Sequence, residues 1–302
     1  MTRPPPRPPW QRVGGHGPTG RRPADTRERS YLYLPDYLTA AARSEAVAWL
    51  ATLTPLWEQR YSTVRSLPPG RAQRPLLRPV YWLGNWQFAC LGYYEPPRGV
   101  RDRCVAAEPF PSWLARIAAD AEARIHAQFA AVDVPRGWHL NTALVNFYGH
   151  RRDGDRWTDV ARVGDHRDFE PGPVVSLSMG ERALFQFVPR GRDGARGPVR
   201  TQWLDDGSLQ AFGGRYWKDE VLHRVQRVDG RRGVELPPTI DGFRTRRVNI
   251  TLRYVPPEHV VPAAGLGAAA LADVRGYLET LATTVPFFAQ ALSALPRSLS
   301  RI

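Results

Sequence analysis

Val174-Val175-Ser176-Leu177-Ser178-Met179 and Ala183-Leu184-Phe185-Gln186-Phe187-Val188 are two runs of strand-forming residues on either side of Gly180-Glu181-Arg182. Their β-branched and aromatic residues favour strands, and a three-residue connection containing glycine predicts a hairpin. Similar short runs occupy 142–148, 208–212 and 247–255. Many short strands with Gly/Pro-rich connections are typical of a sandwich or jelly-roll rather than a parallel βαβ sheet. The sequence therefore predicts an all-β core from about residue 140 to residue 255.

Apolar residues at helical spacing precede this core in two places. The first pattern begins after Asp36 and ends before Pro55. The second begins at a capping residue, Ser112, and continues to about residue 130. We expect these helices to brace one face of a sheet, which makes the fold class α+β, an all-β core with flanking helices.

The two ends of the chain differ from this central part. Residues 1–29 are rich in Pro, Gly and Arg and poor in hydrophobic residues, so we expect a disordered basic tail. After Pro256-Pro257 the chain becomes Ala-rich, which predicts a helical extension over 256–302. One domain over 30–255 lies between them.

The chain is strongly basic. It has 42 Lys and Arg against 29 Asp and Glu, a net charge of +13 over 302 residues. This balance favours a polyanionic partner, with nucleic acid ahead of an anionic membrane surface; a solubility or codon effect is the alternative. Only two cysteines, Cys90 and Cys104, are present, so a disulfide framework and a cysteine-based zinc site are excluded. With no apolar leader and no long apolar run, we expect a monomeric cytoplasmic protein without a membrane partner.

A pair of possible metal ligands, His166 and Asp168, lies two residues apart in Gly164-Asp165-His166-Arg167-Asp168. On a strand or extended loop, this spacing points both side chains to the same side. A salt-bridged surface pair gives the same triplet, so the pair needs a third ligand to indicate a metal site. His223 is the best candidate, because an antiparallel meander can return it beside His166; a solvated loop histidine is the alternative.

The segment Arg247-Val248-Asn249-Ile250-Thr251-Leu252-Arg253 alternates polar and apolar residues with strict period two. A strand here has one wholly polar face, which could simply face solvent. The placement of an arginine at each end favours another interpretation. Two guanidinium groups that both point inward could bind the two carboxylates of a short dicarboxylate.

Several motifs of this sequence together resemble those of the AlkB-family Fe(II)/2-oxoglutarate-dependent dioxygenases. They are R-x-N-x-T-x-R at 247–253, H-x-D-x-E at 166–170, Asn146-Phe147-Tyr148, Val175-Ser176-Leu177-Ser178-Met179-Gly180 with Phe185-Gln186-Phe187, and Gly213-Gly214 before His223. The resemblance covers about residues 80–255. It implies a double-stranded β-helix, Fe(II) as cofactor, and 2-oxoglutarate and O2 as cosubstrates.

The resemblance also implies roles for individual residues. Iron would be held by His166, Asp168 and His223. Arg247 and Tyr148 would contact the distal carboxylate of 2-oxoglutarate. Arg253 and Asn146 would lie near its metal-bound end, with Asn249 supporting.

For the substrate, the resemblance implies that Glu170 accepts a hydrogen bond from the exocyclic amine of a target base. Residues from about 60 to 110 resemble a nucleotide-recognition lid, in which Trp86 or Tyr93 could stack on a flipped base. Alternatively, these aromatic residues belong to the core. The stretch between Tyr148 and His166 is longer than in the best-known members, and Phe212 stands where a Trp often precedes the Gly pair; these departures lie around substrate recognition and leave the iron chemistry intact.

The resemblance therefore implies oxidative demethylation of alkylated nucleic-acid bases of the DNA-repair type, releasing formaldehyde, succinate and CO2. The basic loops at 149–163 and 189–200 favour a phosphate backbone without choosing DNA over RNA. Two alternatives stay open. One is an oxygenase that acts on tRNA, protein or a small molecule, and the other is a non-catalytic basic module that binds nucleic acid.

Overall fold

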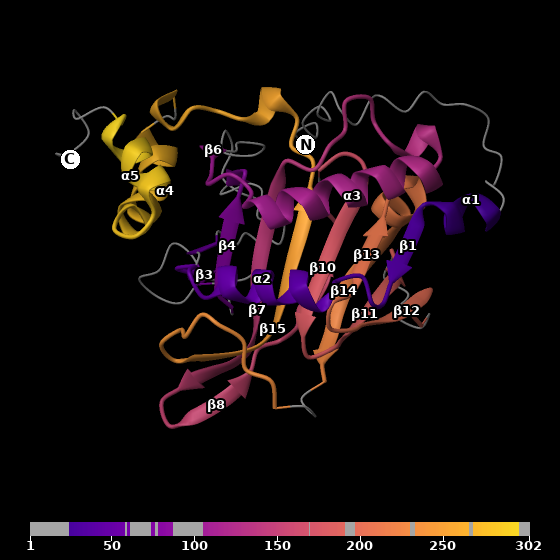
Figure 1. Ribbon diagram of the computed structural model, residues 1–302, viewed down its shortest axis with the longest axis horizontal. Helices are drawn as coiled ribbons and strands as arrows, with labels where there is room; N and C mark the ends of the chain where they lie inside the picture. Colours follow the sequence, from indigo (N-terminus) through magenta and orange to yellow (C-terminus); the bar gives the residue numbers. More distant parts are fainter. Residues whose placement is uncertain are drawn as a thin grey trace, which may run out of the picture.

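The structure is a computed structural model (Figure 1), and it describes residues 24–57, 59–60, 74–75, 78–86, 105–168, 170–190, 197–229, 233–265 and 268–295. Within these residues, two antiparallel sheets form the body of the protein. The larger sheet has the order β1 (Tyr31–Leu34), β13 (Leu209–Phe212), β10 (Val174–Gly180), β15 (Phe243–Arg253), β7 (Thr142–Asp153) and β4 (Val80–Leu83), with β8 (Arg156–Asp159) also paired to β7.

The second sheet has the order β12 (Arg200–Leu204), β11 (Ala183–Pro189), β14 (Val221–Val228) and β9 (Val163–His166). Two short ladders complete the strands of the described residues: β2 (Gln59–Arg60) with β3 (Arg74–Pro75), and β5 (Asn85–Trp86) with β6 (Val105–Ala106). The chain passes repeatedly from one main sheet to the other, as between β10 and β11 and between β13 and β14. This arrangement is the predicted jelly-roll, with helices outside it.

Two helices, α2 (Ala40–Leu50) and α3 (Ser112–Gln128), cross one face of the larger sheet (Figure 1). Trp49 of α2 meets Trp113 of α3 with ring centroids 5.3 Å apart. Leu50 and Leu114 share one core cluster with Leu177 of the sheet. The predicted bracing helices are confirmed, although α3 is preceded by Pro111 at its N-cap rather than capped by Ser112.

The predicted hairpin between 174–179 and 183–188 is wrong. Strand β10 pairs with β13 and β15 in the larger sheet, whereas β11 pairs with β12 and β14 in the second sheet. The three residues between them therefore form a corner that carries the chain from one sheet to the other. Gly180 has φ +89°, and the Glu181 carboxylate is buried against Arg246 at 3.0 Å. The local sequence of a glycine-containing turn is the same whether its two strands pair with each other, as in a hairpin, or belong to different sheets. Only the pairing of each strand with distant strands distinguishes the two cases.

Gly180→Ala is expected to lower the free energy of unfolding. A Cβ here would lie 2.4 Å from the backbone oxygen of Arg246, at a φ that L-residues rarely adopt. We expect a loss of about 2 kcal/mol or more and a fall in Tm of roughly 5 °C, measured by thermal and denaturant unfolding. Gly137→Ala is the matched control, because Gly137 has φ +75° and nothing within 4 Å of its added Cβ. Equal losses in the two variants would contradict the proposed tight corner.

The ends of the chain are partly described. Residues 24–29 form the helix α1 (Ala24–Arg29), so the prediction of a disordered tail is wrong for these residues, and residues 1–23 lie outside the described part. In the described part of the predicted helical extension, the chain forms α4 (Ala268–Ala282) and α5 (Pro286–Ser293). Leu278 and Phe288 of these helices belong to the same core cluster as Leu177 of the larger sheet. Much of the predicted lid at 60–110 lies outside the described residues, so the lid stays a prediction.

Among the described helices, none combines the length and apolar character needed to cross a membrane.

Candidate active site

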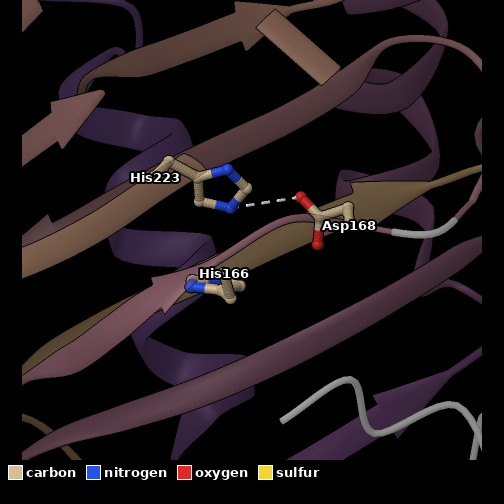
Figure 2. A group of neighbouring side chains, drawn as sticks. All are labelled: His166, Asp168 and His223. Carbon is tan, nitrogen blue, oxygen red and sulfur yellow. Dashed lines mark ion pairs between the residues drawn. The ribbon is translucent and has the colours of Figure 1, made fainter. Parts of the chain in front are cut away.

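Three possible metal ligands meet between the second sheet and the inner face of the larger one. His166 ends β9, Asp168 follows two residues later, and His223 lies on β14 directly opposite His166 in the ladder. Their ligand atoms all lie within 4.8 Å of one another (Figure 2). The prediction that an antiparallel return brings His223 beside His166 is confirmed.

The spacing of the donor atoms suits a shared metal ion. The His223 Nε2 and Asp168 Oδ2 atoms are 3.5 Å apart, which is too far for a good hydrogen bond. First-row metals bind nitrogen and oxygen at about 2.0–2.2 Å, so two ligands of one ion lie up to about 4.4 Å apart. Only small side-chain shifts are needed to bring all three donors onto one ion.

Neighbouring groups fix the two imidazole rings. The Nδ1 atom of His166 lies 2.8 Å from the carbonyl oxygen of Gly164, so Nδ1–H donates there and Nε2 keeps its lone pair for a metal. The His223 ring stacks on Phe185, with centroids 5.6 Å apart and planes 20° apart, and Phe212 meets it edge-on at 5.2 Å. These contacts hold His223 Nε2 toward Asp168, as Figure 2 shows.

The charge states of the three side chains also suit a metal. Burial lowers the pKa of both His166 and His223, so both are neutral at pH 7 and can donate lone pairs. Burial alone would raise the pKa of Asp168, but the positive charge of Arg253, together with that of Lys218, outweighs it, so the pKa is well below its usual range. Two neutral imidazoles and one carboxylate on one side of a metal leave open positions for other ligands.

The predicted polar face of β15 points into the molecule. Val248, Ile250 and Leu252 lie in the core cluster that includes the helices, so the alternating side chains face the second sheet. Arg247 is 1% exposed, and Arg253 and Asn249 are also buried. The alternative of a solvent-facing strand is therefore excluded. Arg253 Nη2 lies 2.7 Å from Asp168 Oδ1, which ties this face to the ligand cluster.

Comparison with known protein families agrees with this geometry. Residues 30–253 match the family model of the 2OG-Fe(II) oxygenase superfamily. The chain belongs to this superfamily. It is accordingly a 2-oxoglutarate-dependent dioxygenase that uses Fe(II), 2-oxoglutarate and O2.

The oxygenase is similar to the solved structure of OsALKBH1, with a TM-score of 0.46 and 19% sequence identity over 74% of this chain and 98% of that chain. No curated protein matches the sequence.

Arg253 orients the carboxylate of the predicted ligand set in the oxygenase. It holds Asp168 Oδ1, which leaves Oδ2 facing His223. We expect Arg253→Met to weaken Fe(II) affinity by about 10- to 100-fold, the usual effect of losing a group that orients a metal ligand. Competition with a metal-sensitive fluorescent chelator measures this. Arg224→Met is the control, because Arg224 pairs with the partly exposed Asp165; a wild-type affinity in Arg253→Met would contradict the role.

Arg247 is the deepest cation of the oxygenase's polar face. Burial lowers its pKa to about 10, so it remains charged at pH 7. Its Nη2 donates to Ser178 Oγ at 2.9 Å and its Nη1 to the Leu204 carbonyl at 3.4 Å. Among the described residues, its Nε is buried without a hydrogen-bond partner. A buried guanidinium held by neutral groups is suited to an anionic ligand.

Three other predicted cosubstrate residues of the oxygenase lie on β15 and the neighbouring strand β7. Tyr148 and Asn146 lie on β7 opposite Arg247 and Asn249 in the ladder. Asn249 donates to Ser176 Oγ at 2.7 Å and to the Leu177 carbonyl at 3.1 Å, so its amide joins β15 to β10. Because that amide is engaged by the protein, it suits the predicted supporting role better than direct contact with a ligand.

Two residues that the sequence analysis did not select also lie here. Arg78 donates from Nε to Asn146 Oδ1 at 3.0 Å. Lys218 belongs to a π-helical turn (Tyr216–Glu220) before β14 and is 8% exposed. Burial lowers its pKa, while the charges of Asp168 and Glu170 raise it. No motif surrounds Arg78 or Lys218, so only the folded structure brings them to the site of the oxygenase.

The predicted substrate residues of the oxygenase have different placements. The Glu170 side chain is 10% exposed, and its Oε2 lies 3.7 Å from Arg253 Nε, beside the ligand cluster. Trp86 is 2% exposed and packs in the core cluster, which favours the core alternative over base stacking. Tyr93 lies outside the described residues.

Proposed function

We propose that this oxygenase removes methyl groups from alkylated nucleic-acid bases. One observation carries the proposal: a two-histidine, one-carboxylate cluster, His166, Asp168 and His223, lies beside a buried acid, Glu170. In the AlkB-like motif H-x-D-x-E, that acid stands where the family recognises the exocyclic amine of a base. The net charge of +13 supports a polyanionic substrate.

The chemistry needs a site that holds iron and 2-oxoglutarate together. We assign iron to His166, Asp168 and His223, which leaves three positions for other ligands. When bound, Fe(II) and 2-oxoglutarate supply, with O2, the oxidation that hydroxylates a substrate C–H bond while 2-oxoglutarate becomes succinate and CO2. Hydroxylation of an N-methyl group gives an N-hydroxymethyl group. This product loses formaldehyde and returns its nitrogen to the unmodified base.

The chain's own residues position the reactants. We assign the distal carboxylate of 2-oxoglutarate to Arg247 and Tyr148, because a buried arginine binds a carboxylate through paired donors. We assign Asn146 and Arg253 to the metal-bound end. In this proposal Glu170 accepts a hydrogen bond from the base, which fixes the methyl group toward the iron.

The test is succinate release by Fe(II)-loaded protein, with a methylated single-stranded oligonucleotide and with its unmethylated twin. We expect succinate to rise with the methylated strand only, and formaldehyde to appear in equal amount. Glu170→Ala should lose the stimulation while keeping slow uncoupled turnover.

Equal succinate with both strands would overturn demethylation of this oligonucleotide and favour the alternative of an oxygenase that acts on tRNA, protein or a small molecule. Absence of any succinate, together with nucleic-acid binding that persists after chelation of the metal, would favour a non-catalytic binding module.

A further inference from the structure

Arg78 is a buried arginine outside every motif of this sequence. It lies just before β4 and is 6% exposed. The backbone around it is fixed, because the Pro79 carbonyl accepts from Phe147 N at 3.2 Å and Val80 pairs with Asn146 in the ladder. Arg78 is therefore held against the part of β7 that carries Asn146 and Tyr148.

Two contacts of Arg78 point toward the site. Its Nε donates to Asn146 Oδ1 at 3.0 Å, and its guanidinium carbon lies 5.0 Å from the centre of the Tyr148 ring. The guanidinium carbon of Arg247 lies 5.9 Å from the same ring. Arg78 thus brings positive charge to a region that already holds Arg247.

The hydrogen bond to Asn146 determines which way this amide faces. A guanidinium group can only donate, so the amide atom turned toward Arg78 must be the oxygen. The Asn146 NH2 group is then turned away from Arg78, and its two N–H donors can bind an oxygen of a ligand. Without Arg78, a rotation of the amide would present the oxygen to the ligand instead, and that oxygen would repel a carboxylate.

We propose that Arg78 is a positioning residue for 2-oxoglutarate. It orients the Asn146 amide so that NH2 faces the cosubstrate, and it adds a guanidinium charge beside Tyr148, near that of Arg247. The proposal rests on the assignment of Asn146 and Tyr148 to 2-oxoglutarate. It gives the segment before β4 a direct effect on cosubstrate affinity.

Binding of 2-oxoglutarate to the Mn(II)-loaded protein tests this without any nucleic acid, for example by isothermal titration. Arg78→Met is expected to weaken 2-oxoglutarate binding by about 10- to 100-fold, the usual cost of a buried hydrogen bond to a charged group. The kcat at saturating 2-oxoglutarate and the affinity for Mn(II) should stay within about threefold of wild type. Arg78→Lys should be intermediate, because lysine keeps the charge but lacks the guanidinium geometry.

Two further variants separate positioning from general stability. Asn146→Asp keeps a partner for Arg78 but presents an oxygen in place of the NH2 group, and it should also weaken 2-oxoglutarate binding. Because Arg78 acts through Asn146, the double variant should lose little more than Asn146→Asp alone. Arg244→Met is the control, since Arg244 is exposed and packs over Trp157 at 4.4 Å.

The outcomes distinguish failure of the proposed role of Arg78 from failure of the assignment of Asn146 and Tyr148 to 2-oxoglutarate. Wild-type 2-oxoglutarate affinity in Arg78→Met overturns the inference alone. Parallel losses of Mn(II) affinity, 2-oxoglutarate affinity and Tm in Arg78→Met also overturn it, because they indicate a purely structural role. Failure of the wild-type protein to bind 2-oxoglutarate would instead overturn the assignment of the pocket.

Discussion

Asp168→Ala is expected to abolish 2-oxoglutarate turnover. Asp168 is the only carboxylate of the cluster formed with His166 and His223 in the described residues. Its removal leaves two neutral imidazoles beside the charges of Arg253 and Lys218. A metal cation would then meet local positive charge with no anionic ligand. We expect Fe(II) affinity to fall by more than about 100-fold, beyond the usual effect of losing a group that only orients a ligand.

The matched control for this variant is Asp165→Ala. Asp165 lies in the same Gly164-Asp165-His166-Arg167-Asp168 segment, but it is partly exposed and pairs with Arg224 at 3.4 Å. Succinate production and metal content should be close to wild type in Asp165→Ala and absent in Asp168→Ala. A circular dichroism melt of both variants checks that loss of activity is not loss of folding. Full activity of Asp168→Ala in metal-controlled buffer would contradict the assignment of Asp168 as a metal ligand.

Arg247→Met is expected to remove most of the affinity for 2-oxoglutarate. Arg247 is fully buried, and its hydrogen bonds to Ser178 and Leu204 use only part of its five donors. Loss of a buried charge pair costs about 2–5 kcal/mol, so the KM for 2-oxoglutarate should rise roughly 30-fold or more. Arg247→Lys should not restore it, because lysine cannot form the paired hydrogen bonds of a guanidinium group.

A change of cosubstrate preference gives a second readout for Arg247. The wild-type enzyme should prefer 2-oxoglutarate over pyruvate, which has the same 2-oxo acid end but no distal carboxylate. If Arg247 binds that carboxylate, Arg247→Met should lose the preference because only 2-oxoglutarate binding is weakened. A variant that weakens both 2-oxo acids equally would place Arg247 at the metal-bound end and contradict the assignment.

The candidate iron ligands could be predicted from sequence because their spacing and the motifs around them resemble those of a known dioxygenase family. His166 and Asp168 have period-two spacing, and His223 follows the strand that was predicted at 208–212. The polar face of 247–253 could also be predicted from sequence, because polar and apolar residues alternate there with period two. Its inward orientation depends on the second sheet, which packs over it and which the sequence pattern alone does not place.

Other features depend on contacts between distant residues. The corner at Gly180-Glu181-Arg182 was mistaken for a hairpin, because the pairing of β10 with β15 and of β11 with β14 is non-local. Arg78 and Lys218 stand in segments without periodic patterns, so their burial beside the site had no signal in the sequence. Trp86 was an open choice between core and base stacking, and its burial could be decided only from the folded chain.

The most direct test of the central claim is mass spectrometry of an N-methylated oligonucleotide after incubation with the protein, Fe(II), 2-oxoglutarate and O2. We expect the wild-type protein to convert the strand to its unmethylated mass. The strand should keep its methylated mass when 2-oxoglutarate is omitted or when the His223→Ala variant replaces the wild-type protein. A methylated strand that keeps its mass, while the same reaction mixture forms succinate, would contradict demethylation of nucleic acid by this oxygenase.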